Sequence, residues 1–146
     1  MFTATYPADI LRETDGNGYY VRFPSLPEAL TGGTDHSDAI SEATDCLAEA
    51  LAGRITRKDS IPPPSRPKRG QRLISVPLYL APKLALYLAI RERGIPNTEL
   101  AKRLGVRETV IRRMLDPKHV TKPERIEKAL LALGKRIVIS FDDVAA

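Results

Sequence analysis

The chain has 146 residues, 42% of them hydrophobic, which leaves room for one domain or two small ones. No apolar run approaches the roughly 18 residues that span a bilayer, and the N-terminus lacks the basic region and apolar core of a signal peptide. The single Cys46 excludes an internal disulfide, and the two histidines are too far apart to suggest a metal site. We therefore expect a cytoplasmic protein with no membrane association, no metal and no cofactor.

Charge is divided unevenly along the chain. Residues 1–60 hold 5 Lys and Arg against 10 Asp and Glu, a net charge of −5, whereas residues 61–146 hold 18 against 8, a net charge of +10. A basic half attracts a polyanion, and an acidic half attracts a basic protein. The pattern predicts two surfaces with different partners, and the alternative for the first half is a plain solvated acidic face.

The first sixty residues predict a small sheet covered by one helix. Phe2–Ile10 is a predicted strand, Asp15–Gly18 a tight turn, and Tyr19–Phe23 a second strand whose side chains alternate between two faces. A short third strand is expected at Glu28–Gly32. Ser37 is the expected N-cap of a helix. Its apolar stripe should pack across one face of the sheet and consists of Ile40, Ala43, Leu47, Ala50, Leu51 and Ile55.

A proline-rich connector follows this helix. Residues 60–70 contain four prolines and no periodicity, which is typical of an extended, stiff segment; a proline-rich ligand for a recognition domain is the alternative. Leu73–Leu78 is predicted to return to the first sheet as a strand. We therefore place a first module at residues 1–78, which includes the connector, and a second module at residues 79–146.

The second module is predicted to be a bundle of short helices. One helix begins near Pro82 and ends at Gly94. Asn97–Asp116, NTELAKRLGVRETVIRRMLD, then predicts two helices joined at Gly105, because a tight turn between crossed helices favours a positive φ. The residues expected to be buried in this two-helix unit are Leu100, Ala101, Leu104, Val106, Ile111, Met114 and Leu115.

The outward face of the two-helix unit is basic and rich in hydrogen-bonding groups. A packed back with such a front suits the major groove of DNA, and the alternative is an ordinary helical hairpin with a solvated charged face. We expect Arg107, Thr109 and Arg112 to lie near base edges, and Lys102, Arg103 and Arg113 to lie near phosphates. The predicted DNA-binding set is Thr98, Lys102, Arg103, Arg107, Glu108, Thr109, Arg112 and Arg113.

A fourth helix and a strand are predicted to end the chain. Thr121 and Glu124 form a capping-box pattern, Gly134 follows the helix, and Arg136–Phe141 is the strand. Because a lone strand leaves backbone groups unpaired, we expect it to pair with the same strand of a second copy in a dimer or tetramer. The predicted contact residues are Ile137, Ile139 and Phe141. The alternative is that this strand folds back onto its own domain.

Several short motifs, taken in order, resemble the HicB antitoxins of type II toxin–antitoxin systems. In the first module these are Tyr6–Ala8, Gly18–Pro27, Thr31–Gly33, a helix from Ser37, and Ile61–Ser65. The second module resembles the HicB subgroup that carries a helix-turn-helix domain, through Leu115–Pro117 and Leu133–Arg136. One departure is Ser25, which stands where an acidic residue is expected after Phe-Pro.

The resemblance implies an α+β chain, with a small partial ribonuclease H-like sheet and one packed helix, then an all-α helix-turn-helix domain that ends in a short dimerising strand. It also implies that the first module blocks HicA, a small basic ribonuclease toxin, and that the second module binds the operator of the toxin–antitoxin operon. The residues we expect to meet the toxin are the aromatics Tyr19 and Tyr20 and the acidic residues Asp38, Glu42, Asp45 and Glu49.

Catalysis is not expected, because ribonuclease H chemistry needs carboxylates that converge on two metal ions. The acidic residues of the first module are spread over a strand, a turn and a helix, and show no such cluster. We therefore interpret the chain as a non-enzymatic antitoxin and autorepressor, whose partners are a HicA-type toxin, operator double-stranded DNA and further copies of itself. The alternatives are a transcription factor that senses a small ligand and, more remotely, an active nuclease.

Overall fold

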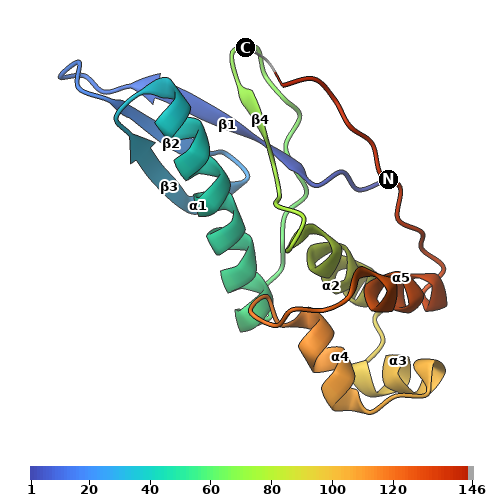
Figure 1. Cartoon of the computed structure of the whole chain (residues 1–146). Helices are drawn as coiled ribbons and strands as arrows, with labels where there is room; N and C mark the ends of the chain where they lie inside the picture. The colour runs from blue at the N-terminus through green and yellow to red at the C-terminus, as the bar shows by residue number, and fades with distance from the viewer. Residues whose placement is uncertain (145–146) are drawn as a thin grey trace.

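The computed structural model describes residues 1–144 as a mixed α+β chain (Figure 1). A four-stranded antiparallel sheet with α1 lies at one end of the molecule, α3 and α4 lie at the other, and α2 lies between them. The predicted α+β class is confirmed. The elements in chain order are β1 (Thr5–Arg12), β2 (Tyr19–Phe23), β3 (Leu26–Gly33), α1 (His36–Arg57), β4 (Arg72–Ser75), α2 (Ala81–Arg93), α3 (Asn97–Leu104), α4 (Glu108–Leu115) and α5 (Pro123–Ala132).

The sheet has the order β3-β2-β1-β4, and each neighbouring pair is antiparallel. The predicted turn between β1 and β2 is closed by the Glu13 N–H, which donates to the Gly18 carbonyl at 3.0 Å. The third strand extends further than the predicted Glu28–Gly32. The fourth returns to the sheet as predicted, where it lies beside β1, but it covers Arg72–Ser75 and not the predicted Leu73–Leu78. The sheet therefore joins segments from both sides of the proline-rich connector.

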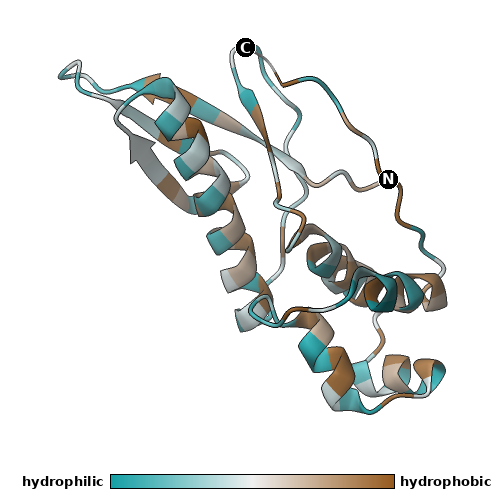
Figure 2. Cartoon of the chain, in the orientation of Figure 1, coloured by the Kyte–Doolittle hydropathy of each residue, from teal (hydrophilic) through white to brown (hydrophobic). Residues whose placement is uncertain are grey.

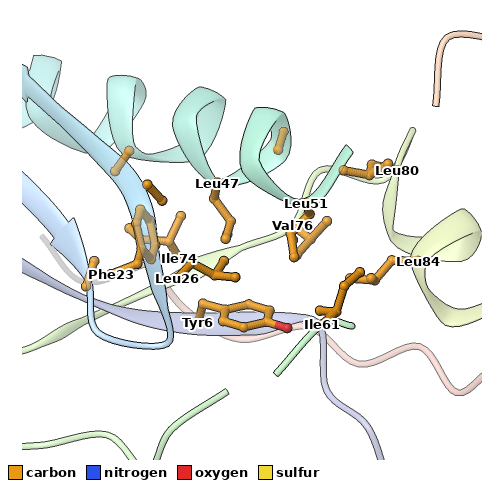
Figure 3. Packing of buried hydrophobic residues seen from close by; sticks show 14 of the residues in the cluster. Tyr6, Phe23, Leu26, Leu47, Leu51, Ile61, Ile74, Val76, Leu80 and Leu84 are labelled. Carbon is orange, nitrogen blue, oxygen red and sulfur yellow. The ribbon is translucent and has the colours of Figure 1, made fainter. Parts of the chain in front are cut away.

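Helix α1 covers one face of the sheet and closes a first hydrophobic core (Figure 3). Val21 and Phe23 are buried in this core and Tyr19 packs at its margin, so the predicted alternation along β2 is confirmed. Figure 3 shows Phe23 and Tyr6 of the sheet on the side that faces Leu47 and Leu51 of α1. The apolar face of the sheet and the apolar stripe of the helix thus cover each other.

The prediction that Ser37 caps α1 is wrong, because Asp35 is the N-cap. The Asp35 carboxylate accepts the N–H of Asp38 at 2.8 Å. The Asp38 carboxylate accepts in return the N–H of Thr34 at 2.9 Å and its hydroxyl at 3.2 Å. A carboxylate two positions earlier than Ser37 therefore satisfies the free N–H groups at the start of the helix.

Gly33, at the end of β3, lies directly against the backbone at the start of α1. A Cβ on Gly33 would lie 2.4 Å from the Ala39 nitrogen and 2.6 Å from the Ala39 Cα. These are backbone atoms of a packed helical turn, so they have little room to move. We expect Gly33→Ala to lower the free energy of unfolding by about 1–3 kcal/mol or more, as measured by urea denaturation.

Gly53→Ala is the matched control for this prediction. An added Cβ at Gly53 would meet only the far end of the flexible Arg57 side chain. Alanine is favoured over glycine inside a helix by about 1 kcal/mol, so this variant should be as stable as the wild-type protein or more stable. Equal losses of stability in the two variants would contradict the close approach of β3 and α1.

The connector at residues 60–70 forms no helix or strand and is held against the first core. Ile61 is buried there, the Tyr6 hydroxyl donates to the Pro62 carbonyl at 3.0 Å, and the Ser65 N–H donates to the Ser25 Oγ at 2.9 Å. The absence of helix and strand agrees with the predicted lack of periodicity in this segment. Ser25, which departs from the expected family pattern, therefore has a structural contact with the connector.

Helices α2 to α5 surround a second hydrophobic core, and α2 contributes to both cores. Leu84 and Tyr87 belong to the first core, whereas Leu86 and Ile90 belong to the second. Leu115, the last residue of α4, packs against both. The two cores are therefore joined by a shared helix and not by a flexible linker.

Of two predictions near the C-terminus, one is wrong and the other is not met within a single chain. No capping box forms at Thr121, because its hydroxyl accepts a hydrogen bond from Lys83 and α5 begins without a side-chain cap. Residues 135–144, here called the C-terminal tail, form no strand, since a lone strand finds no backbone partner within one chain. The tail extends from α5 and carries a hydrophobic stretch between hydrophilic residues (Figure 2). Across residues 1–144, no helix is long and apolar enough to span a membrane.

Candidate functional site

The first candidate site is the unit formed by α3, the turn at Gly105 and α4. Gly105 has a φ of 67°, as predicted for this turn, and the Val106 N–H donates to the Ala101 carbonyl at 3.0 Å. Leu100 and Ile111 are fully buried between the helices. Val106 is 37% exposed, so its predicted burial is wrong: it lies in the turn before α4 begins.

Most of the residues predicted to bind DNA are exposed on this unit. Glu108 is the exception, because it is only partly exposed. Two of the cations are engaged in ion pairs one helical turn apart: Arg112 with Glu108 at 2.7 Å, and Arg103 with Glu99 at 3.2 Å. The remaining exposed members of the predicted set are Thr98, Lys102, Arg107, Thr109 and Arg113.

Arg107 and Arg112 lie at different positions along α4. Arg107 is the N-cap of α4 with extended backbone, and its side chain forms no ion pair among residues 1–144. Arg112 lies in the last turn of the same helix. Its contact with Glu108 is a solvent-exposed pair, and such pairs stabilise by only a few tenths of a kcal/mol to about 1 kcal/mol. Both guanidinium groups can therefore reach an anionic or hydrogen-bonding partner at low cost.

One buried cation beside this unit was not predicted from the sequence. Lys83 of α2 is only 2% exposed. Its Nζ donates to the carbonyls of Arg113 at 3.1 Å and Met114 at 3.0 Å and to the Thr121 hydroxyl at 2.9 Å. Burial lowers the pKa of Lys83, and the nearby charge of Asp116 opposes that shift. The sequence feature that could have revealed this residue is the position of Lys83 on the apolar side of a helix.

A second candidate surface lies on α1. Glu42, Asp45 and Glu49 are exposed, and their spacing of three and four residues places them along one side of the helix. We call these three residues the acidic stripe. Asp38 differs from these three residues, because its carboxylate is engaged in hydrogen bonds at the start of α1. The acidic stripe is thus smaller than the predicted acidic set.

Cys46 lies on α1 between members of the acidic stripe. Burial raises the pKa of its thiol, and the charges of Glu49 and Glu42 raise it further. A raised pKa keeps a thiol protonated and therefore weakly nucleophilic. This cysteine does not have the environment of a catalytic nucleophile.

The two tyrosines predicted to meet a toxin do not share a surface. Tyr19 lies on the α1 side of the sheet, where its ring meets His36 edge-on with centroids 5.7 Å apart and its hydroxyl accepts from Arg12 at 3.4 Å. Tyr20 is the next residue along β2 and points to the opposite face. Only Tyr19 therefore lies on the same side of the sheet as the acidic stripe.

The carboxylates of the first module do not come together in a cluster that could bind a metal ion. Burial raises the pKa of Asp9, but hydrogen bonds from Arg22 at 3.0 Å and Gln71 at 3.1 Å outweigh it and hold the pKa below its ordinary value. Within residues 1–144 no three His, Cys, Asp or Glu side chains are grouped so that they could hold a metal ion.

Of the residues predicted to hold subunits together, Ile137 differs from the other two. It is half-buried and packs against the second core. Ile139 and Phe141 are 85% and 100% exposed. Apolar side chains this exposed at spacing two leave one side of the tail without a partner in the single chain.

The sequence of this chain is similar to those of known antitoxins. A sequence family described as the HicB-like antitoxin of bacterial toxin–antitoxin systems matches residues 5–85. The chain is 38% identical to Antitoxin HicB 2 of Photorhabdus laumondii over 125 residues, which cover 86% of this chain and 88% of that protein. It is 35% identical to Antitoxin HicB of Escherichia coli K12 over 132 residues, covering 90% and 95%. The chain therefore belongs to the HicB-like family of bacterial antitoxins.

Proposed function

We propose that this antitoxin neutralises a HicA-type ribonuclease toxin and represses its own operon by binding operator DNA. The observation that carries the second activity is the basic, exposed front of α4 on a fully packed back. Family membership supports the first activity, because an antitoxin implies a toxin partner. We propose no catalytic activity, since the acidic residues available for metal-dependent hydrolysis are engaged elsewhere or lie apart.

In this proposal α3 and α4 form a helix-turn-helix, with α4 as the recognition helix in the major groove. The left-handed glycine between the helices and the small Ala101 at their crossing support this assignment. Arg107, Thr109 and Arg112 meet base edges, and Lys102, Arg103 and Arg113 meet phosphates.

The sheet and α1 form the toxin-binding module, which we propose is a partial ribonuclease H-like fold. A ribonuclease is electropositive where it holds RNA, so an inhibitor with matching negative charge can cover that surface. The acidic stripe is the proposed source of that charge, with Tyr19 beside it. We keep the division at residues 78 and 79 as the order of the modules along the chain, although α2 contributes side chains to both cores.

Two measurements test the two activities separately. In bacterial cells that carry an inducible HicA-type toxin from the neighbouring reading frame, co-expression of this chain should restore growth. In fluorescence anisotropy, the purified chain should prefer DNA from upstream of its own gene over a scrambled duplex of equal length. Continued arrest with soluble antitoxin would overturn the first activity, and equal affinity for the two duplexes would overturn the second.

We also propose that the C-terminal tails of two copies pair as antiparallel strands, which gives the two-fold dimer that reads two half-sites. Deleting residues 136–146 should then yield monomers by light scattering and weaken operator binding by at least about tenfold, because each half-site alone binds weakly. Deleting only residues 142–146, which leaves Ile139 and Phe141 in place, should keep the dimer. A dimeric 136–146 deletion would place the interface elsewhere.

A further inference from the structure

The end of α4 is held by a buried ammonium group from a different helix. Lys83 of α2 donates to the main-chain carbonyls of Arg113 and Met114, in the last turn of α4, and to the hydroxyl of Thr121 in the segment that follows. Its three N–H groups are thus matched by three acceptors within 3.1 Å. The ammonium also lies at the negative end of the α4 dipole.

Burying an ammonium group is costly unless it is fully hydrogen-bonded. A cap on α4 that stayed in contact with solvent would avoid that cost. Because hydrogen bonds are directional, the three acceptors of the buried ammonium fix the position of the C-terminal turn of α4 relative to α2. Leu115, the last residue of α4, adds an apolar contact near this ammonium, since it packs against both cores.

Helix α2 is itself fixed on the first core. Leu80, Leu84 and Tyr87 are buried there, and the Tyr87 hydroxyl donates to the main-chain carbonyl of Asp59, just beyond the end of α1. Arg91 donates to the carbonyl of the preceding residue, Lys58, at 3.3 Å. A continuous set of packed and hydrogen-bonded groups therefore runs from the end of α1 through α2 to the end of α4.

We infer that Lys83 is a positioning residue for operator recognition: its ammonium fixes the orientation of α4 on α2, and through α2 relative to the toxin-binding module. This inference rests on the proposed DNA-binding function. Lys83 itself does not reach DNA, because its side chain is buried. It acts only through the placement of Arg107 and Arg112 on α4.

The test compares the full-length Lys83→Met variant with Lys102→Met. The first substitution keeps the apolar stem and removes the buried ammonium; the second removes one exposed charge from α3. Three quantities are measured: amide hydrogen exchange in residues 108–116 without DNA, the ratio of affinities for the upstream duplex and a scrambled duplex, and the slope of log affinity against log salt concentration.

For Lys83→Met we expect faster exchange in α4 with unchanged exchange in α1, and a loss of about tenfold or more in the affinity ratio. The salt slope should stay unchanged, because no phosphate contact is lost. For Lys102→Met we expect unchanged exchange and an unchanged ratio, with a slope smaller by about one unit. A role in folding stability alone would lower the melting temperature of Lys83→Met without changing the ratio.

Three results would overturn the inference: unchanged exchange in α4, an unchanged affinity ratio in a wild-type protein that does discriminate, or a salt slope reduced as in Lys102→Met. If the wild-type protein shows no preference between the duplexes, the proposed function fails, and the exchange experiment alone decides whether Lys83 positions α4. Should Lys83→Met be unfolded by circular dichroism, Thr121→Val removes one of the three acceptors, and its exchange and affinity ratio should change in the same direction by less.

Discussion

An Arg107→Ala, Arg112→Ala double variant should lose its preference for operator DNA while keeping its fold. Each bidentate contact to a base edge contributes on the order of 1–3 kcal/mol to discrimination. The loss of both should therefore weaken operator binding by at least about thirtyfold. Binding to a scrambled duplex should fall much less, because the phosphate contacts remain. Anisotropy titrations against both duplexes at one salt concentration measure the two effects.

The fold should survive because neither side chain is part of a core. Both arginines are exposed, and Arg112 contacts Glu108 in a solvent-exposed ion pair. Glu108 must release Arg112 when that guanidinium turns toward a base, which costs little for such a pair. Glu108→Gln should therefore leave the operator preference in place or increase it slightly.

Arg125→Ala, Lys128→Ala is the matched control, since it removes the same charge from exposed positions on α5. This control should weaken binding to both duplexes by similar factors, if at all, through the long-range field. A double arginine variant that retains the full operator preference would show that α4 is not the recognition helix. Loss of preference in the control and not in the arginine variant would move the recognition surface to α5.

Much of this architecture was predictable because it depends on local chemistry. The turn at Asp15–Gly18 and the left-handed Gly94 and Gly105 follow from residues that tolerate positive φ. The alternation along β2 and the buried Leu100 and Ile111 follow from hydrophobic periodicity. In each case the residues that determine the structure are near neighbours in the sequence.

The errors occurred where a distant residue decides the outcome. Thr121 has the sequence of a capping box, but Lys83, 38 residues earlier, takes its hydroxyl as an acceptor. The strand predicted at Arg136–Phe141 is rich in β-branched residues, but a strand needs a partner, and one chain supplies none there. Neither the buried lysine nor the missing partner can be detected from periodicity within a short window.

The net charge of the first module depends on where the module is taken to end. Residues 61–78 add four cations and no acids, so the first module as a whole carries a net charge of −1. Those cations belong to the connector and β4, whereas the acidic stripe lies on α1. Three of the ten acidic residues of the first module form this stripe, and we expect attraction for a basic toxin to come mainly from it.

Reversing the acidic stripe should therefore abolish toxin neutralisation. In a Glu42→Lys, Asp45→Lys, Glu49→Lys variant, like charges would face the electropositive surface of a ribonuclease, and like-charge contacts at an interface cost several kcal/mol. We expect at least about a hundredfold weaker complex, measured by biolayer interferometry, and renewed growth arrest on co-expression. The helix itself should persist, because the substituted side chains are exposed and lysine is a good helix former.

A control with the same change in net charge separates the stripe from the total charge. Glu124→Lys, Glu127→Lys, Asp142→Lys changes three exposed carboxylates outside α1, and it should neutralise the toxin as the wild-type chain does. The wild-type association rate should also fall as salt rises, since screening weakens long-range attraction while short-range contacts persist. A stripe variant that binds as tightly as the wild-type protein would place the toxin on another face. A salt-independent association rate would remove charge as the cause of recognition, because an acidic face that guides a basic partner must lose that effect when ions screen it.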